Sequence, residues 1–174
     1  MRVLDCHVHW FPRSVFDDLC ERKGSYPRAE RNGVGGYEIF GTYGRVGVVG
    51  YRRKTWFDLD DHFRHMDATG HQVDFICSLG PFATFFSEIS PADGIYYARM
   101  YNDEMAAAQR RHPNRMWAAG VVPLQDTQTA IDELNRMVQK LGLIGVSIPG
   151  SIGQDNHIDI QLTTQDVNRF AQRD

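Results

Sequence analysis

The chain has 174 residues, of which 42% are hydrophobic and 24% charged, and its formal net charge is -3. These values are typical of one globular domain, spanning 1–174, that is long enough to bury a core. Mixed charge without a Lys/Arg-rich run disfavours nucleic acid as a partner. No window reaches the roughly 18 apolar residues of a membrane span, and the N-terminus lacks a signal-peptide pattern. We therefore expect a cytoplasmic protein with neither a membrane nor a nucleic-acid partner.

Short apolar runs bounded by Gly, Pro or charged residues recur along the chain, as in the buried strands of a parallel sheet. Four strands are predicted, at 2–6, 73–79, 116–122 and 142–148. Amphipathic helices are predicted between them, at 59–70, 91–113 and 126–142, and a further helix is predicted at 163–174. This alternation predicts an α/β fold built from right-handed βαβ units.

The helix predicted at 126–142 carries suitable residues at both ends. Asp126 or Thr127 can cap its first turn, and Gly142 can terminate it. Its apolar residues recur at helical spacing between these two points.

One segment, 11–57, breaks the alternation because it is long and rich in glycine and aromatic residues. A loop of this length is usually a functional lid or carries structure of its own. Alternating apolar residues within it predict a small β-hairpin over the mouth of the sheet, formed around Tyr37, Ile39, Val46, Val48 and Val49. The alternative is a surface excursion without a function.

The three cysteines, Cys6, Cys20 and Cys77, form no CxxC pair. An odd number without paired spacing argues against a disulfide framework. We expect all three to be buried apolar thiols in a reducing compartment.

The first strand leads into the sequence DCHVHWFP at 5–12, which contains two histidines. Residues two apart in a strand point to one face, so His7 and His9 are expected to project together, with Cys6 and Val8 on the other side. Ligands of parallel α/β folds bind at the carboxyl ends of the strands, where these histidines lie. Divalent metals such as zinc bind neutral imidazole, and a catalytic site uses three or more protein ligands. The motif therefore predicts half of a metal site; two solvent-facing histidines are the alternative.

The same stretch is similar to the D-x-H-x-H-x-x-P signature of the metal-dependent amidohydrolase superfamily. The resemblance continues through WFDLDDHFRHMDATGHQVDFICSL at 56–79 and through the long stretch from YNDEMAAAQRRHP to LGLIGVSI at 101–148. These segments resemble the branch that contains 2-amino-3-carboxymuconate-6-semialdehyde decarboxylase and related non-oxidative aromatic acid decarboxylases. The resemblance runs along nearly the whole chain.

This resemblance implies a (β/α)8 TIM-type barrel and a divalent metal, commonly zinc. His7 and His9 are the matched ligands. A full barrel of this kind needs about 250 residues, so the chain is expected to be truncated to about the first four βα units, with the long insertion after strand 1. In the family the third ligand histidine follows the fifth strand, which would begin beyond Asp174.

Substrate contacts are also implied. The branch holds a substrate carboxylate with an arginine shortly before a tryptophan, and Arg52 and Arg53 are the candidates here, with Arg45 further back. Trp10 and Phe82 are further candidate substrate-binding residues. No catalytic acid or base is assigned.

The remaining histidines are weaker candidates for the metal. His157 follows the fourth strand and is an incidental third ligand or, the preferred interpretation, a polar loop residue. The others lie on or near the predicted helices and are expected to be solvated or capping: His62, His65, His71 and His112.

Three functions follow from this pattern. The first is a metal-dependent carboxy-lyase that decarboxylates an unsaturated or aromatic carboxylic acid, incomplete as this chain. The second is a metal-dependent hydrolase or hydratase of ring-cleavage products or lactones. The third is a non-catalytic half-barrel that self-associates, for instance as a homodimer, to cover its open edge strands.

Overall fold

The computed structural model describes residues 2–22, 26–41, 44–49, 56–78, 85–86 and 89–149. Several predictions fall outside these ranges: the roles of Arg52, Arg53, Phe82 and His157, and the helix at 163–174. No helix in the described ranges combines the length and the apolar character needed to cross a membrane.

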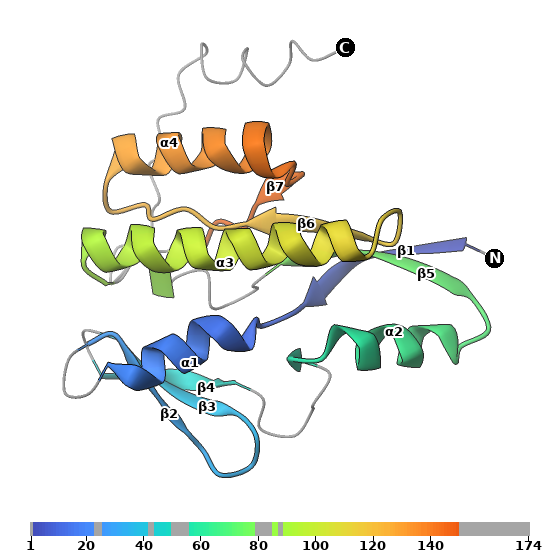
Figure 1. Ribbon diagram of the computed structural model, residues 1–174, viewed down its shortest axis with the longest axis horizontal. Coiled ribbons are helices and arrows are strands. Elements are labelled where there is room, and N and C mark those ends of the chain that lie inside the picture. Colours follow the sequence, from blue (N-terminus) through green and yellow to red (C-terminus); the bar gives the residue numbers. More distant parts are fainter. Residues whose placement is uncertain are drawn as a thin grey trace.

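A parallel sheet of four strands forms the centre of the fold (Figure 1). Its strands, in spatial order, are β1 (Arg2–His9), β5 (Gln72–Ser78), β6 (Met116–Gly120) and β7 (Gly145–Val146). Every neighbouring pair is parallel. The four predicted strands are thus confirmed, although β7 has only two residues. In the described part of the chain the sheet is open, with β1 and β7 at its edges.

Helices connect these strands, as the βαβ pattern predicts. They are α2 (Leu59–Asp67), α3 (Pro91–Arg111) and α4 (Thr127–Arg136), the last continued by the π-helical turn η3 (Met137–Leu141). In Figure 1, α3 lies along the sheet between α4 and α2. Asp126 is the N-cap of α4 and accepts a hydrogen bond from the N–H of Thr129 at 2.7 Å, and Gly142 ends η3 with φ 71°. Both predicted termini are confirmed.

The two faces of the parallel sheet differ in burial, because successive side chains point to opposite sides of a strand. Phe75 of β5 and Met116 of β6 are neighbours in register and are almost completely buried in the core with the large side chains of α3. The intervening residues Ile76 and Trp117 are also neighbours in register but only half-buried. The helices therefore cover one face of the sheet more fully than the other.

The insertion carries structure of its own. It contains α1 (Arg13–Glu21) and an antiparallel sheet of β2 (Arg28–Arg31), β3 (Tyr37–Gly41) and β4 (Gly44–Val49), with β3 in the centre. The predicted hairpin is confirmed as β3 and β4, whereas α1 and β2 were not predicted. The rings of Phe16 and Tyr37 stack at 5.3 Å and join α1 to this sheet. Its position over the mouth of the parallel sheet stays a prediction.

A buried polar network joins α3, α4 and the end of β6. The Asn102 amide donates to the carbonyl of Val121 at 2.9 Å and to the Glu133 carboxylate at 2.8 Å, and its oxygen accepts from the N–H of Val121 at 2.8 Å. Glu133, fully buried, also accepts from Arg136 at 2.8 Å. A side chain at Gly120 would place its Cβ 2.5 Å from the Asn102 oxygen. The network thus fixes the carboxyl end of β6 against two helices.

Candidate metal centre

The side chains of His7 and His9 face each other at the carboxyl end of β1. Their Nε2 atoms are 3.1 Å apart, and the two rings are in edge contact at 4.7 Å between centroids. His7 is exposed and His9 is partly buried. Both histidines thus project to the same side, as the spacing predicts.

The separation of these nitrogens fits two ligands of one metal ion. Two imidazole nitrogens that bind one ion at about 2.0–2.1 Å, with an angle between about 90° and 109°, lie about 2.8–3.4 Å apart. The observed 3.1 Å falls within this interval. The same distance is that of a hydrogen bond between the two rings, so it is compatible with one shared ion but does not by itself assign the pair to a metal.

Ser78, at the carboxyl end of the adjacent strand β5, orients His9. The two residues are partners in register, and His9 Nδ1 lies 3.4 Å from both the carbonyl and the hydroxyl oxygen of Ser78. When Nδ1–H donates to this carbonyl, Nε2 keeps a lone pair directed toward His7. A hydrogen bond of this kind on the far nitrogen is the usual support of a metal-binding histidine.

A bulge in β1 sets the backbone of the motif. The pairing of β1 with β5 shifts between Asp5 and Val8, and the Asp5 carboxylate accepts a hydrogen bond from the N–H of His7 at 2.9 Å. Because a bulge inserts one residue against the partner strand, side chains no longer alternate strictly through it. Cys6 is exposed, whereas Val8 is buried. The prediction that Cys6 shares the buried side of Val8 is wrong for this reason.

The three thiols lie in different environments. Cys77 is fully buried, and burial raises the pKa of its thiol to about 12. Cys20 is partly buried, and Cys6 is exposed at the candidate metal centre. Only Cys77 fully matches the expected buried apolar thiol; all three cysteines are free.

Among the described residues, no third donor lies beside His7 and His9. Within the described ranges, no group of three or more His, Cys, Asp or Glu side chains is placed to hold a metal ion. His7 and His9 therefore form a two-donor site in this part of the chain, and their role as metal ligands stays a prediction.

The segment after His9 packs into the core. Trp10 is buried, and its indole N–H donates to the carbonyl of Phe57 at 3.1 Å. The N–H of Phe11 donates to the carbonyl of Trp56 at 2.8 Å. These bonds hold the end of the motif beside residues that directly follow the Arg52–Arg53 region in sequence. Substrate binding by Trp10 stays a prediction, as it does for the two arginines and Phe82.

Arg45 has a different environment. It lies on β4, and its guanidinium pairs with the Glu38 carboxylate of β3 at 3.7 Å, with both side chains exposed. The ion pair lies within the small antiparallel sheet.

His62 is neither solvated nor capping, so that prediction is wrong for it, whereas His112 is the C-cap residue of α3, as the capping alternative predicts. His62 packs edge-on against Phe75, with ring centroids 5.4 Å apart, and its Nε2 is buried without a hydrogen-bond partner among the described residues. His112 packs on Phe63 at 4.3 Å. Burial lowers the pKa of both imidazoles, because it disfavours the charged form. His65 and His71 are exposed, as expected.

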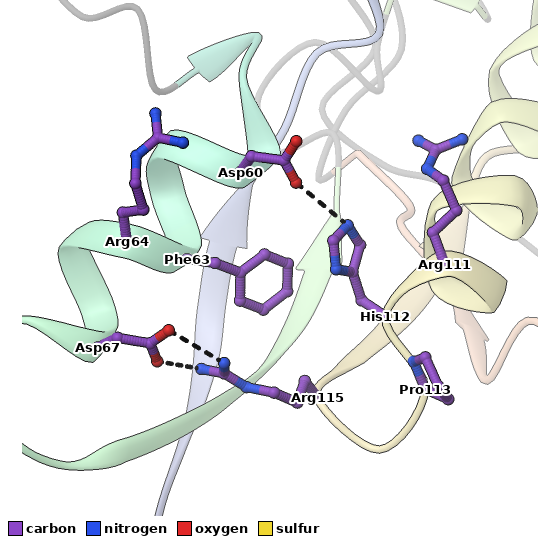
Figure 2. A pocket seen from close by; sticks show the side chains of 8 residues that line it. All are labelled: Asp60, Phe63, Arg64, Asp67, Arg111, His112, Pro113 and Arg115. Atoms are coloured by element: carbon purple, nitrogen blue, oxygen red, sulfur yellow. Dashed lines mark hydrogen bonds and ion pairs between the residues drawn. The ribbon is translucent and has the colours of Figure 1, made fainter.

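A groove of about 370 Å³ lies between α2 and the turn from α3 to β6. Figure 2 shows two facing pairs in it: Arg115 reaches Asp67, at 2.8 Å in its shorter contact, and His112 faces Asp60 at 3.9 Å. Phe63 lies between the two pairs. The two hydrogen bonds from Arg115 to Asp67 tie α2 to the start of β6, at the opposite end of the strands from His7. We interpret the groove as a structural contact.

The chain is similar to one protein family and to several known decarboxylases. The amidohydrolase family profile matches residues 4–169. The 2-amino-3-carboxymuconate-6-semialdehyde decarboxylase of Dictyostelium discoideum is 33% identical over 72 residues, which are 41% of this chain and 20% of that protein. The gamma-resorcylate decarboxylase of Rhizobium radiobacter is 33% identical over 91 residues, which are 52% of this chain and 27% of that protein.

A solved structure shows the same fold. The dihydroxybenzoic acid decarboxylase from Polaromonas sp. JS666, with bound manganese and the inhibitor 2-nitroresorcinol, matches with a TM-score of 0.55 and 21% identity. The match covers 84% of this chain and 38% of that chain, so the chain spans less than half the length of these relatives. The family match extends over nearly the whole sequence and agrees with the motif that begins at Asp5. On this evidence the chain belongs to the amidohydrolase family.

Proposed function

We propose that this chain provides the first part of a metal-dependent carboxy-lyase centre, which removes CO2 from an unsaturated or aromatic carboxylic acid. The observation that carries the proposal is the His7–His9 pair at the carboxyl end of β1, with its Nε2 atoms 3.1 Å apart. The decarboxylase names of its relatives support this reaction class. Their substrates support a small carboxylic acid as the ligand.

His7 and His9 would hold a divalent ion, zinc or manganese, through their Nε2 atoms. Such an ion supplies Lewis acidity, which polarises a substrate oxygen and lowers the pKa of bound water. The manganese in the Polaromonas structure supports a divalent metal. The two histidines provide fewer donors than the three or more of a catalytic site, so further donors are required from outside the described residues.

The residues around the pair would hold it in one conformation. Ser78 orients the His9 ring, and the Asp5 carboxylate fixes the His7 backbone. Buried Val8 anchors the strand between the two histidines in the core. Positioning of this kind keeps donors within the narrow range of geometry that a metal site needs.

Arg52 or Arg53 would anchor the substrate carboxylate. A guanidinium stays charged and binds a carboxylate through two parallel hydrogen bonds. The bonds from Trp10 and Phe11 hold residues 56–57, which follow these arginines in sequence, next to the end of the motif. Trp10 and Phe82 are proposed to line the same space.

A metal-binding assay tests the proposal, because the first part of a centre is expected to bind the ion without completing the reaction. The chain is dialysed against Mn(II) or Zn(II) with and without gamma-resorcylate, and bound metal and bound acid are quantified. We expect metal binding, and metal-dependent binding of the acid, that are lost in the His7→Ala/His9→Ala variant and kept in His65→Ala, which alters an exposed histidine of α2. Metal content that is equal in the double variant would contradict the proposed centre.

A further inference from the structure

Trp10 directly follows the second histidine of the motif, and its indole joins the motif to the segment that precedes α2. The side chain is only 6% exposed, and its indole N–H donates to the carbonyl of Phe57 at 3.1 Å. The next residue, Phe11, donates its backbone N–H to the carbonyl of Trp56 at 2.8 Å. Two hydrogen bonds therefore hold the two residues after the motif against two consecutive residues far along the chain.

The segment 56–57 is supported on its other side as well. Asp58, the next residue, is the N-cap of α2 and accepts a hydrogen bond from the N–H of Asp61 at 2.9 Å. The rings of Phe11 and Trp56 are in contact, with their centroids 5.3 Å apart. Aromatic pairs at this separation attract each other beyond the area that they bury. The acceptor of the indole bond is therefore part of a packed and capped unit.

His9 depends on this support because it is the last residue of β1. The register of β1 with β5 ends at the pair of His9 and Ser78, and an irregularity precedes it, between Asp5 and Val8. The end of a strand opens easily where its backbone is held by few contacts. The backbone of His9 is thus held by the ladder on one side and by the bonds of the next two residues on the other.

We propose that Trp10 is a positioning residue for the candidate metal centre and couples this centre to the segment 56–57. The indole bond fixes the backbone that follows His9, so that its Nε2 stays 3.1 Å from that of His7. The coupling works in both directions, because an effect of one site on the affinity of another is reciprocal. An ion bound by the two histidines therefore holds Trp10 more firmly against Phe57. This inference rests on the metal role proposed for His7 and His9, and it does not require decarboxylation.

Other roles of Trp10 make a different demand on its side chain. A ring that only fills the core, or that only lines a substrate space, needs its shape but not its N–H. The positioning role needs the N–H, because this donor makes the bond to the carbonyl of Phe57. Removal of the donor leaves a buried carbonyl without that partner, which loosens the contact.

The test is the Zn(II) affinity of Trp10→Phe, measured by isothermal titration of the purified chain. Phenylalanine keeps an aromatic ring and removes the donor. We expect the affinity to fall about tenfold, since outer-shell changes at metal sites cost about 10–100-fold. Trp117→Phe, at a half-buried tryptophan of β6, is the matched control and should bind Zn(II) as the wild type does. Circular dichroism checks that both variants are folded.

A second replacement separates the donor from the shape of the ring. Benzothienylalanine, incorporated at position 10, has the shape of tryptophan with sulfur in place of the N–H group. It fills the same space, so the comparison holds even where Trp10→Phe does not fold. We expect it to weaken Zn(II) binding by a similar factor, because it lacks the same donor.

Hydrogen exchange measures the coupling. Zn(II) should slow amide exchange in the peptide 56–61 of the wild type and should leave it unchanged in either replacement at position 10. A benzothienylalanine chain that binds Zn(II) as tightly as the wild type, or exchange at 56–61 that does not respond to Zn(II), would overturn the inference and leave the metal role intact. A wild-type chain that binds no Zn(II) would contradict the metal role itself, and the inference with it.

Discussion

The substitution Asn102→Ala provides a quantitative test of what holds the carboxyl end of β6. The Asn102 side chain makes two hydrogen bonds to the backbone of Val121, at 2.8 and 2.9 Å, and one to the Glu133 carboxylate at 2.8 Å. All three residues are completely buried. Alanine leaves the Val121 N–H and C=O without partners and removes a neutral donor from Glu133.

The expected loss follows from these three bonds. A neutral hydrogen bond contributes about 1 kcal/mol and one to a charged group about 1.5–3 kcal/mol, so the free energy of unfolding should fall by about 3.5–5 kcal/mol. A domain of this kind is stable by about 5–15 kcal/mol, so the loss is a large share of the total.

Urea unfolding followed by circular dichroism measures this loss. Gln128→Ala is the matched control, because its amide donates to Asp132 at 2.9 Å on the exposed side of α4, and a change within about 0.5 kcal/mol is expected there. The slope of the transition should stay constant. A loss below about 1 kcal/mol for Asn102→Ala would refute the network as a determinant of stability.

Three further predictions follow from single residues. Burial lowers the pKa of His112, so the folded state favours the neutral ring. The contribution of the neutral ring to the free energy of unfolding is complete above the unfolded pKa of about 6.5. This contribution is lost as the pH falls through the lower pKa of the folded state. Urea midpoints at pH 7.5 and 5.5 should therefore differ less in His112→Gln than in the wild type, and parallel values would contradict this. Exposed Cys6 should react with a thiol reagent in the native protein, whereas buried Cys77, with its raised pKa, should react only on unfolding; early labelling of Cys77 in a peptide map would disprove the burial. Gly142→Ala should reduce the free energy of unfolding by about 1–2 kcal/mol, because φ is 71° there; an unchanged urea midpoint would argue against the left-handed helix end.

Elements with a strong local pattern were predictable from the sequence. The helical segment that begins at Thr127 follows a cap at Asp126 and ends at Gly142. The cap, the helical spacing of the apolar residues and the terminal glycine all indicate the same helix. His7 and His9 also come together at the end of β1, as their spacing in the chain predicts. These features depend on residues close together in the chain.

Features that depend on distant partners were not predictable. Helix α1 follows Pro12, has no side-chain cap, and buries Phe16 against Tyr37 of β3. Its stability comes from tertiary packing, which a local pattern does not reveal. The bulge beside Cys6 is likewise set by the register with β5. The Asn102–Glu133 bond joins residues 31 apart in sequence.

The most direct test of the central claim is metal titration of the His7→Ala and His9→Ala single variants beside the wild type. Isothermal titration with Zn(II) measures the affinity, and His71→Ala controls for an exposed histidine on a turn. Each single variant should bind more weakly by more than about tenfold, since even outer-shell changes at a metal site cost about 10–100-fold. Affinities of both variants equal to that of the wild type would show that His7 and His9 do not bind one ion together.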